Sequence, residues 1–376
     1  MWSFVRPDAK RVFSNALAQE TFPRYYLLLH HQVQARYLLA KRMALTNGVS
    51  LTRSTENELW EEHRRIQDLF NTQVDEWDRS GEEKVRSVSP NYLDLKVELL
   101  KRLTDPCRLC SRECMKERLH GELGFCSVPG EGSIASVFPH MGEESVLVPS
   151  GTIFFNGCTF NCVFCQNSDI AQEWSRSSPV KGKGHLSDQL VHHINSLSKQ
   201  GVRNINYVGG DPTPHLPQIL QSWQGTNRNV CQLFNSNHYL SKLCQELIVD
   251  IFDFWLPDFK YWDNTFAKKM SNVPNYREVL TRNLLMCAQV GSGEIIVRHL
   301  VMPGRVDSDT KPILRWIAEE LDNGKVMVNI MGQYRPAYKV QKGLEYEVIN
   351  RTVSSAEMTE AKEFADSLGL KWRLVS

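Results

Sequence analysis

Three cysteines fall close together on one predicted loop, at Cys158, Cys162 and Cys165, in a C-x3-C-x2-C spacing. A run of β-forming residues, Thr152 to Phe155, leads into them and ends at the turn signal Asn156-Gly157. The thiols therefore follow directly after a predicted buried strand. In an open parallel sheet or a barrel, this carboxyl end of the strands is where ligands bind.

Three thiolates on one short loop predict a metal centre. Soft sulfur ligands select zinc, copper(I) or iron–sulfur clusters. A structural zinc site is normally closed by four protein ligands, whereas a four-iron cluster held by three cysteines leaves one iron open to a small molecule. A zinc knuckle, or three unrelated buried cysteines, is the alternative interpretation.

Four more cysteines, Cys107, Cys110, Cys114 and Cys126, form a second group with the spacing C-x2-C-x3-C-x11-C. Four thiols suffice either for a closed zinc site or for a second [4Fe-4S] cluster. Glycines and charged residues between them predict a loop-rich module, which metal binding would hold together. The sequence does not decide between the two metals.

The string SGTIFFNGCTFNCVFCQN, with Phe164 just before its last cysteine, resembles the signature of the radical SAM superfamily. Within that superfamily it resembles uncharacterised iron–sulfur proteins related to pyruvate formate-lyase activating enzyme. The resemblance covers roughly residues 90 to 340. It implies a [4Fe-4S] cluster on the first three cysteines, S-adenosylmethionine (SAM) at the open iron, and Phe164 beside the adenine.

The resemblance also implies cofactor contacts at the ends of the next two strands. Gly209 and Gly210 match a glycine-rich motif whose backbone contacts the methionyl amino end of SAM, and Asp211 follows where the family often has Glu. Asn235 and Ser236, at the end of the third strand, match polar residues near the cofactor ribose or a bound cation.

Charged residues at two further strand ends are the candidate catalytic residues. Asp258 and Lys260 resemble the D-x-K strand end of activating enzymes, and they point the same way because side chains alternate along a strand. They are expected to contact a cation or the substrate, with a structural ion pair as the alternative. Arg298 could hold the cofactor carboxylate or a substrate acid as a bidentate donor, while His299 faces the opposite way.

Short β-rich runs alternate with helical segments over the same part of the chain, which implies parallel strands joined by right-handed crossovers. Six such units predict an α/β fold, a partial (β/α)6 TIM-like barrel, which is the fold of the superfamily. The strands are expected at Gly151–Phe155, Asn204–Val208, Val230–Phe234, Ile251–Leu256, Glu294–Val301 and Lys325–Ile330. The helices are expected near Ser187–Lys199, Pro217–Trp223, Leu240–Leu247, Asn275–Val290, Thr310–Leu321 and Ser355–Leu368, and a last short strand at Trp372–Val375.

We expect four parts in the chain. They are a helical N-terminal extension (1–100), a four-cysteine metal-binding module (101–130), a radical SAM core barrel (145–340) and a C-terminal closing segment (341–376). Residues 130–147 are expected to be a connection. In the extension, Thr55 to Glu58 form a capping-box pattern, and Ser80-Gly81 should end the helix that follows.

Composition limits the possible partners. Forty-four basic and 43 acidic residues give a net charge of +1, so no nucleic-acid partner is expected. No apolar run is long enough to span a membrane, and the start of the chain lacks a signal-peptide core. Seven of the ten cysteines lie in the two metal-like groups, which indicates a reducing, cytoplasmic setting rather than a disulfide framework.

The activity that the resemblance implies is reductive cleavage of SAM to a 5′-deoxyadenosyl radical, which abstracts hydrogen from a substrate. By analogy with activating enzymes, the substrate would be a protein or peptide, and the electron donor would be a flavodoxin or a ferredoxin. A small-molecule substrate is one alternative. A non-catalytic iron–sulfur electron carrier, or a metal-stabilised scaffold, is another, but Gly209 and Gly210 argue against it, since an electron carrier needs no methionine site.

Overall fold

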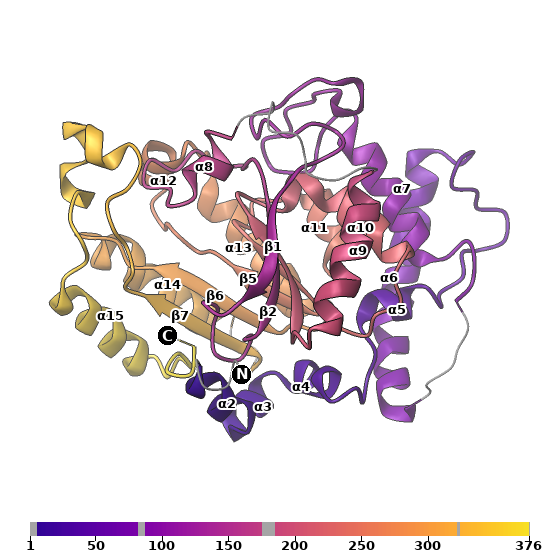
Figure 1. Cartoon of the computed structure of the whole chain (residues 1–376), viewed down its shortest axis with the longest axis horizontal. Coiled ribbons are helices and arrows are strands. Elements are labelled where there is room, and N and C mark those ends of the chain that lie inside the picture. The colour runs from indigo at the N-terminus through magenta and orange to yellow at the C-terminus, as the bar shows by residue number, and fades with distance from the viewer. Residues whose placement is uncertain (1–5, 82–86, 175–184, 322–323, 376) are drawn as a thin grey trace.

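A computed structural model describes residues 6–81, 87–174, 185–321 and 324–375. Its centre is one seven-stranded sheet in which the strands follow their order in the chain (Figure 1). The first strand pairs antiparallel with the second, and all later pairs are parallel. The strands are β1 (Ile134–His140), β2 (Ser150–Phe155), β3 (Asn204–Gly209), β4 (Cys231–Ser236), β5 (Phe254–Pro257), β6 (Ile295–Leu300) and β7 (Val326–Met331).

The six parallel strands β2 to β7 confirm the predicted partial barrel. Each overlaps one of the six predicted strands, and within the described residues no pairing closes the sheet between its two edges. Helices follow the strands as expected, and α8 and α12 are two that were not predicted. They are α8 (Ser168–Ala171), α9 (Leu186–Lys199), α10 (Leu216–Gln224), α11 (Lys242–Ile248), α12 (Asn264–Ser271), α13 (Tyr276–Gln289), α14 (Lys311–Trp316) and α15 (Ser355–Ser367).

Two expectations about the ends of the sheet are wrong. Residues 130–147 do not merely connect, because they contain β1. β1 is an edge strand and has no continuous apolar run by which it could have been predicted. Phe138 is 41% exposed, and Pro139 is tolerated because the strand lies at the edge of the sheet. Residues Trp372–Val375 form no strand but a turn, whose apolar side chains are mostly buried. A short apolar run in the sequence does not by itself distinguish a strand from a buried turn.

The N-terminal extension is helical. The capping box at Thr55 and Glu58 is present, and Gly81 ends that helix in a left-handed conformation. The helices are α2 (Pro7–Phe13), α3 (Ala16–Thr21), α4 (Pro23–Leu29), α5 (Arg36–Ala40), α6 (Glu56–Ser80) and α7 (Tyr92–Thr104). Helices α2 to α4 lie at the amino end of the barrel strands, and α7 packs beside α10 and α11 (Figure 1).

Buried ion pairs attach this extension to the barrel. Lys96 on α7 lies 2.7 Å from Asp250, and both side chains are fully buried. Arg24 on α4 pairs with Asp253, immediately before β5, at 3.1 Å. Glu294, immediately before β6, accepts hydrogen bonds from the backbone N–H groups of Arg24 (2.7 Å) and the next residue. Charged and polar groups at the amino end of the barrel therefore attach the extension to the strands.

All ten cysteines lie within the described residues, and none forms a disulfide. Among the described residues, the helices include none with the length and apolar character needed to cross a membrane.

Candidate functional site

A cavity of about 680 Å3 opens at the carboxyl end of the strands. The predicted residues that line it come from five separate segments of the chain, and they are Cys158, Cys162, Phe164, Cys165, Gly209, Gly210, Asn235, Asp258, Lys260 and Arg298. Two predicted cofactor residues, Asp211 and Ser236, are not among the lining residues. The tertiary structure thus brings most of the predicted site together in one hollow.

Cys158, Cys162 and Cys165 lie on the loop that follows β2. The backbone of this loop is bonded to the end of α12, where Asn161 N donates to Ser271 O at 3.0 Å. Hydrogen-bond donors also reach the sulfur atoms: Ser271 Oγ lies 3.0 Å from Cys162 Sγ, and Asn237 Nδ2 lies 3.4 Å from Cys158 Sγ. Donors of this kind stabilise a thiolate once a metal is bound.

The three thiols fit a cluster better than a single ion. Burial raises the pKa of Cys162 to about 11, so metal binding would have to displace its proton. Among the described residues, no three His, Cys, Asp or Glu side chains are arranged to hold one metal ion. A four-iron cluster takes each thiolate on a different iron and needs no such convergence.

Gly209 and Gly210 pack against this cysteine loop. The positive φ belongs to Gly209 (128°), where a Cβ atom would overlap the backbone of Phe155. A Cβ atom on Gly210 would overlap the carbonyl oxygen of Gly157, the residue before Cys158. Both glycines are therefore required for the close approach of the β3 end to the loop, and their backbone faces the cavity.

Asp211 turns away from the cavity into the protein. Its carboxylate accepts hydrogen bonds from Thr159 Oγ1, within the cysteine loop, and from Thr213 Oγ1 at 3.2 Å. Burial raises the pKa of Asp211 to about 6, and these hydrogen bonds oppose that shift. In this structure, the side chain braces the cysteine loop against the glycine turn.

The end of β4 presents one of its two predicted residues, Asn235, to the cavity, and Ser236 lies elsewhere. Ser236 Oγ accepts a hydrogen bond from His238 N at 3.0 Å, inside the protein. Asn235 lines the cavity, and Asn237, which the sequence analysis did not select, touches both Cys158 and Lys260. Side-chain alternation along β4 predicts that Asn235 and Asn237 share a face, which is the signal that could have identified Asn237.

Asp258 and Lys260 both line the cavity and form an ion pair with each other. Lys260 Nζ also donates to Asn237 Oδ1 at 2.9 Å. Burial opposes the charge on Lys260, but attraction from Asp258 and the nearby cysteines outweighs it, so the pKa of Lys260 lies above its usual value. The lysine thus keeps a positive charge close to the cysteine loop.

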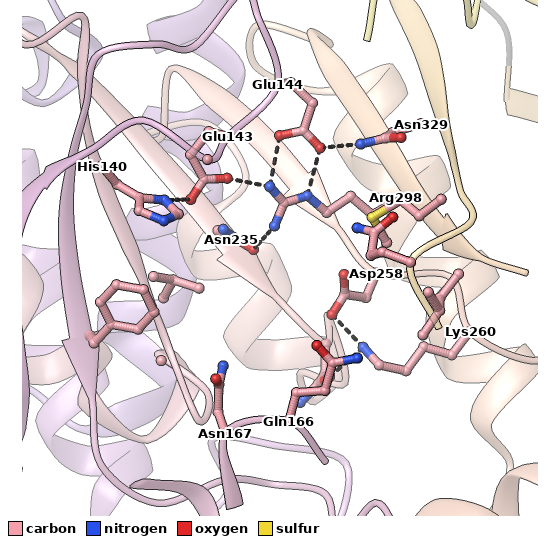
Figure 2. A pocket seen from close by; sticks show the side chains of 18 of the residues that line it. His140, Glu143, Glu144, Gln166, Asn167, Asn235, Asp258, Lys260, Arg298 and Asn329 are labelled. Atoms are coloured by element: carbon pink, nitrogen blue, oxygen red, sulfur yellow. Dashed lines mark hydrogen bonds and ion pairs between the residues drawn. The ribbon is translucent and has the colours of Figure 1, made fainter. Parts of the chain in front are cut away.

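Arg298 on β6 is held by two carboxylates from the segment between β1 and β2 (Figure 2). Its guanidinium donates to Glu144 at 2.7 Å through two nitrogens, and it also contacts Glu143. Asn329 on β7 donates to Glu144 at 2.7 Å, and Asn235 accepts from Arg298 at 3.3 Å. The sequence analysis treated Glu143 and Glu144 as part of a connection, so it missed the partners of Arg298.

Phe164 is buried beside the third cysteine and lines the cavity. Its ring packs edge-on against Tyr334, with ring centroids 5.7 Å apart. This packing fixes the backbone around Cys165, where the sequence resemblance places the adenine.

The second cysteine group sits directly against the first. Ser111 N donates to Tyr239 O at 3.0 Å, beyond the end of β4, and Cys110 bridges to Leu240. Arg112 Nε donates to Thr159 O at 2.8 Å, within the cysteine loop. The two cysteine groups also approach each other closely at Gly157, where a Cβ atom would come within 2.6 Å of the Cys126 carbonyl oxygen.

Within this module the thiols of Cys107 and Cys114 contact each other, and Arg118 Nη1 lies 3.9 Å from Cys107 Sγ. A buried guanidinium beside thiolates offsets their negative charge. The four cysteines therefore have surroundings that suit a thiolate-bound metal centre.

Comparison with known proteins identifies the family. The family model described as the radical SAM superfamily matches residues 152–317, which include the cysteine loop, the glycine turn and strands up to β6. The chain belongs to the radical SAM superfamily. Members of this superfamily bind a [4Fe-4S] cluster and SAM and require a reductant, and the cavity described above offers the three thiols that such a cluster needs.

The chain is also similar to individual proteins. The uncharacterized protein MJ0674 of Methanocaldococcus jannaschii is 38% identical over 355 residues, which cover 92% of this chain and 97% of that protein. A Haemophilus influenzae protein, provisionally named a glycyl-radical enzyme activating enzyme, is 23% identical over 145 residues, 38% of this chain and 47% of that protein. The crystal structure of Streptococcus suis SuiB bound to SAM superposes with a TM-score of 0.40 and 13% identity, covering 56% of this chain and 44% of SuiB.

Proposed function

We propose that this radical SAM protein cleaves SAM reductively to a 5′-deoxyadenosyl radical that abstracts hydrogen from a protein or peptide, in the manner of a glycyl-radical activating enzyme. One observation carries the proposal: Cys158, Cys162 and Cys165 face the same cavity as the backbone of Gly209 and Gly210. The match to the Haemophilus influenzae protein supports the activating-enzyme role. The electron would come from a flavodoxin or a ferredoxin.

The chain's own residues have distinct tasks in this proposal. The three cysteines hold the cluster, with Ser271 and Asn237 donating to two of the sulfurs. Gly209 and Gly210 leave room for the methionyl amino end of SAM, and Lys260 offers a positive charge to its carboxylate. The apolar wall at Phe164 would pack beside the adenine and exclude water.

The test is anaerobic SAM cleavage by the reconstituted protein with dithionite as reductant. Replacing Cys158, Cys162 and Cys165 together by Ala should abolish 5′-deoxyadenosine formation, while Cys231→Ala, at the opposite end of β4, should retain it. Deuterium transfer from labelled peptides into 5′-deoxyadenosine would then identify the substrate. Cleavage that persists in the triple variant would overturn the proposal.

A small-molecule substrate is the second candidate for the same chemistry. The charged layer formed by Glu143, Glu144 and Arg298 closes the inner end of the cavity, so a compact polar molecule could be bound entirely within it. The same deuterium experiment with small molecules separates the two candidates.

We further propose that Cys107, Cys110, Cys114 and Cys126 hold a second metal centre, a [4Fe-4S] cluster or zinc. Metal and sulfide analysis of the protein lacking Cys158, Cys162 and Cys165 tests this. About one zinc per chain would mean a structural site, and about four irons with matching sulfide would mean a second cluster.

A further inference from the structure

The inner end of the cavity carries an excess of negative charge. We call the set Glu143, Glu144, Arg298 and Asn235 the cavity floor. The described residues that line the whole cavity supply four carboxylates, Asp8, Glu143, Glu144 and Asp258, against three cationic groups, Arg6, Lys260 and Arg298.

Two of these cations are matched by a carboxylate of their own. Lys260 pairs with Asp258, and Arg6 pairs with Asp8 at 2.7 Å. On the floor, however, Arg298 must serve both Glu143 and Glu144. Glu143 also contacts His140 Nδ1 at 3.1 Å and accepts a hydrogen bond from Asn206 Nδ2 at 3.0 Å. The two floor carboxylates therefore share one guanidinium.

Both floor carboxylates are buried, with side chains 5% and 1% exposed. Burial would favour the neutral acid, but the charge of Arg298 outweighs it and lowers the pKa of Glu143 to about 2. Two buried carboxylates that share one guanidinium would bind a further cation favourably.

Asn235 supplies a second, independent feature of the floor. This side chain is only 3% exposed and lines the cavity. Its Oδ1 accepts from Arg298, which can only donate, so the orientation of the amide is determined. Its Nδ2 has no hydrogen-bond partner among the described residues. A buried donor is thus free beside the carboxylates and suits a carbonyl oxygen of a ligand.

We propose that the cavity floor binds a primary ammonium group with a carbonyl oxygen beside it, which is the chemistry of an α-amino amide. The ammonium group would contact the carboxylates of Glu143 and Glu144, and the carbonyl oxygen would accept from Asn235 Nδ2. The amino-terminal residue of a peptide and a free α-amino amide both have this chemistry. A substrate acid is disfavoured, because Arg298 is already engaged by two carboxylates.

The inference deepens the proposed function, because it names the substrate class that the radical would meet. It also reassigns Asn235 from the cofactor ribose to the substrate. The binding itself does not depend on SAM cleavage, so the two can fail separately.

Calorimetric titration of the anaerobically reconstituted full chain at pH 7.5 tests the floor. Three probes of similar size separate the two recognition features: glycinamide has both, ethylammonium lacks the carbonyl, and propionamide lacks the charge. Glycinamide should bind about tenfold or more tightly than either, since each missing group leaves a buried partner unpaired. Equal affinity for glycinamide and propionamide would overturn the proposal.

Two variants assign the effect to residues. Glu144→Gln should remove the advantage of glycinamide over propionamide, and Asn235→Ala should remove its advantage over ethylammonium. Retained binding of propionamide by Glu144→Gln, and of ethylammonium by Asn235→Ala, is required to show that each variant is folded. Asp307→Asn, which removes an exposed carboxylate (side chain 85% exposed) far from the cavity lining, should leave all three affinities unchanged. Unchanged preferences in both floor variants would refute the assignment.

A further arm distinguishes the source of the ligand. If glycylglycinamide binds as tightly as glycinamide, and N-acetyl-glycylglycinamide does not bind, the ligand is a peptide amino terminus. Binding of glycinamide alone would indicate a small α-amino amide. 5′-Deoxyadenosine formation is measured on the same preparations: cleavage without glycinamide binding removes the floor proposal only, and binding without cleavage removes the proposed function only.

Discussion

The two ends of the barrel use the same kind of interaction for different purposes. At the amino end, Lys96 and Asp250 are fully buried and pair at 2.7 Å, which attaches helix α7 to the barrel. At the carboxyl end, Arg298 pairs with two carboxylates that border a cavity of about 680 Å3. The difference is the space that remains. Lys96 and Asp250 are fully buried and contribute cohesion, whereas Arg298 and its carboxylates line a cavity and can contact a ligand.

The most damaging change at the carboxyl end should be Gly210→Val. A Cβ atom there overlaps the Gly157 carbonyl oxygen, so the variant must displace the cysteine loop. We expect a loss of both SAM binding and iron content, and 5′-deoxyadenosine formation reduced at least about a hundredfold. Iron analysis, calorimetry and product formation measure the three effects.

Gly201→Ala is the matched control for that change. It replaces a glycine at positive φ with nothing near its Cβ position, so only a small loss of stability is expected. Normal iron content in Gly210→Val would show that the glycine turn and the cysteine loop are independent.

Lys96→Met tests the amino end. It leaves Asp250 buried without its cation, which should lower the free energy of unfolding by about 3 to 5 kcal/mol. Chemical denaturation measures this loss. SAM cleavage per folded molecule should be unchanged, and reduced cleavage per folded molecule would show that the two ends are coupled. Arg64→Met, which breaks a pair between a 53% exposed arginine and Glu246, should cost less than about 1 kcal/mol.

The two ends should also respond to pH in opposite directions. Burial raises the pKa of Glu294 at the amino end to about 8, whereas Arg298 lowers that of Glu143 to about 2 against the effect of burial. The protonated form of Glu294 therefore contributes stability below its unfolded pKa of about 4.5, and this contribution is lost as pH rises to about 8. The contribution of Glu143 is present above about 4.5 and is lost as pH falls towards about 2.

Denaturation over this pH range in Glu294→Gln and Glu143→Gln measures the two contributions. Glu294→Gln should reduce the change in the free energy of unfolding between about pH 4.5 and 8, and Glu143→Gln should reduce the change between about pH 4.5 and 2. Each reduction should reach up to about 3 kcal/mol. A reduction in the same pH range by both variants would contradict the assignment.

The smallest expected effect concerns the contact between the two cysteine groups. Arg112 donates to Thr159 O at 2.8 Å, and its guanidinium lies 3.4 Å from the centre of the Phe125 ring. We expect Arg112→Ala to weaken iron retention at Cys158, Cys162 and Cys165 by a few-fold in a chelator challenge, since one charge-assisted hydrogen bond is lost.

Arg108→Ala is the matched control, because that arginine is in the same module but bonds to Glu56 in the helical extension. Equal effects of the two substitutions would mean that Arg112 stabilises only its own module.

Local patterns were sufficient to predict the six parallel strands, the cysteine loop after β2 and the capping box at Thr55. Each is set by residues adjacent in the chain: the spacing of thiols, a run of β-formers before Asn156-Gly157, or a Thr and Glu three positions apart. The family resemblance added the glycine turn and the strand-end residues. Most of these, including Gly209, Gly210, Asp258 and Arg298, do line one cavity.

Only the tertiary structure showed which side chains face that cavity and what they contact. Asp211 turns to Thr159, Asn237 reaches Cys158, and Arg298 meets Glu143 and Glu144 from a segment about 150 positions earlier in the chain. β1 was missed because an edge strand, buried on neither face along its whole length, needs no continuous apolar run. Contacts between segments distant in the chain depend on how the whole sheet packs, and no local periodicity records them.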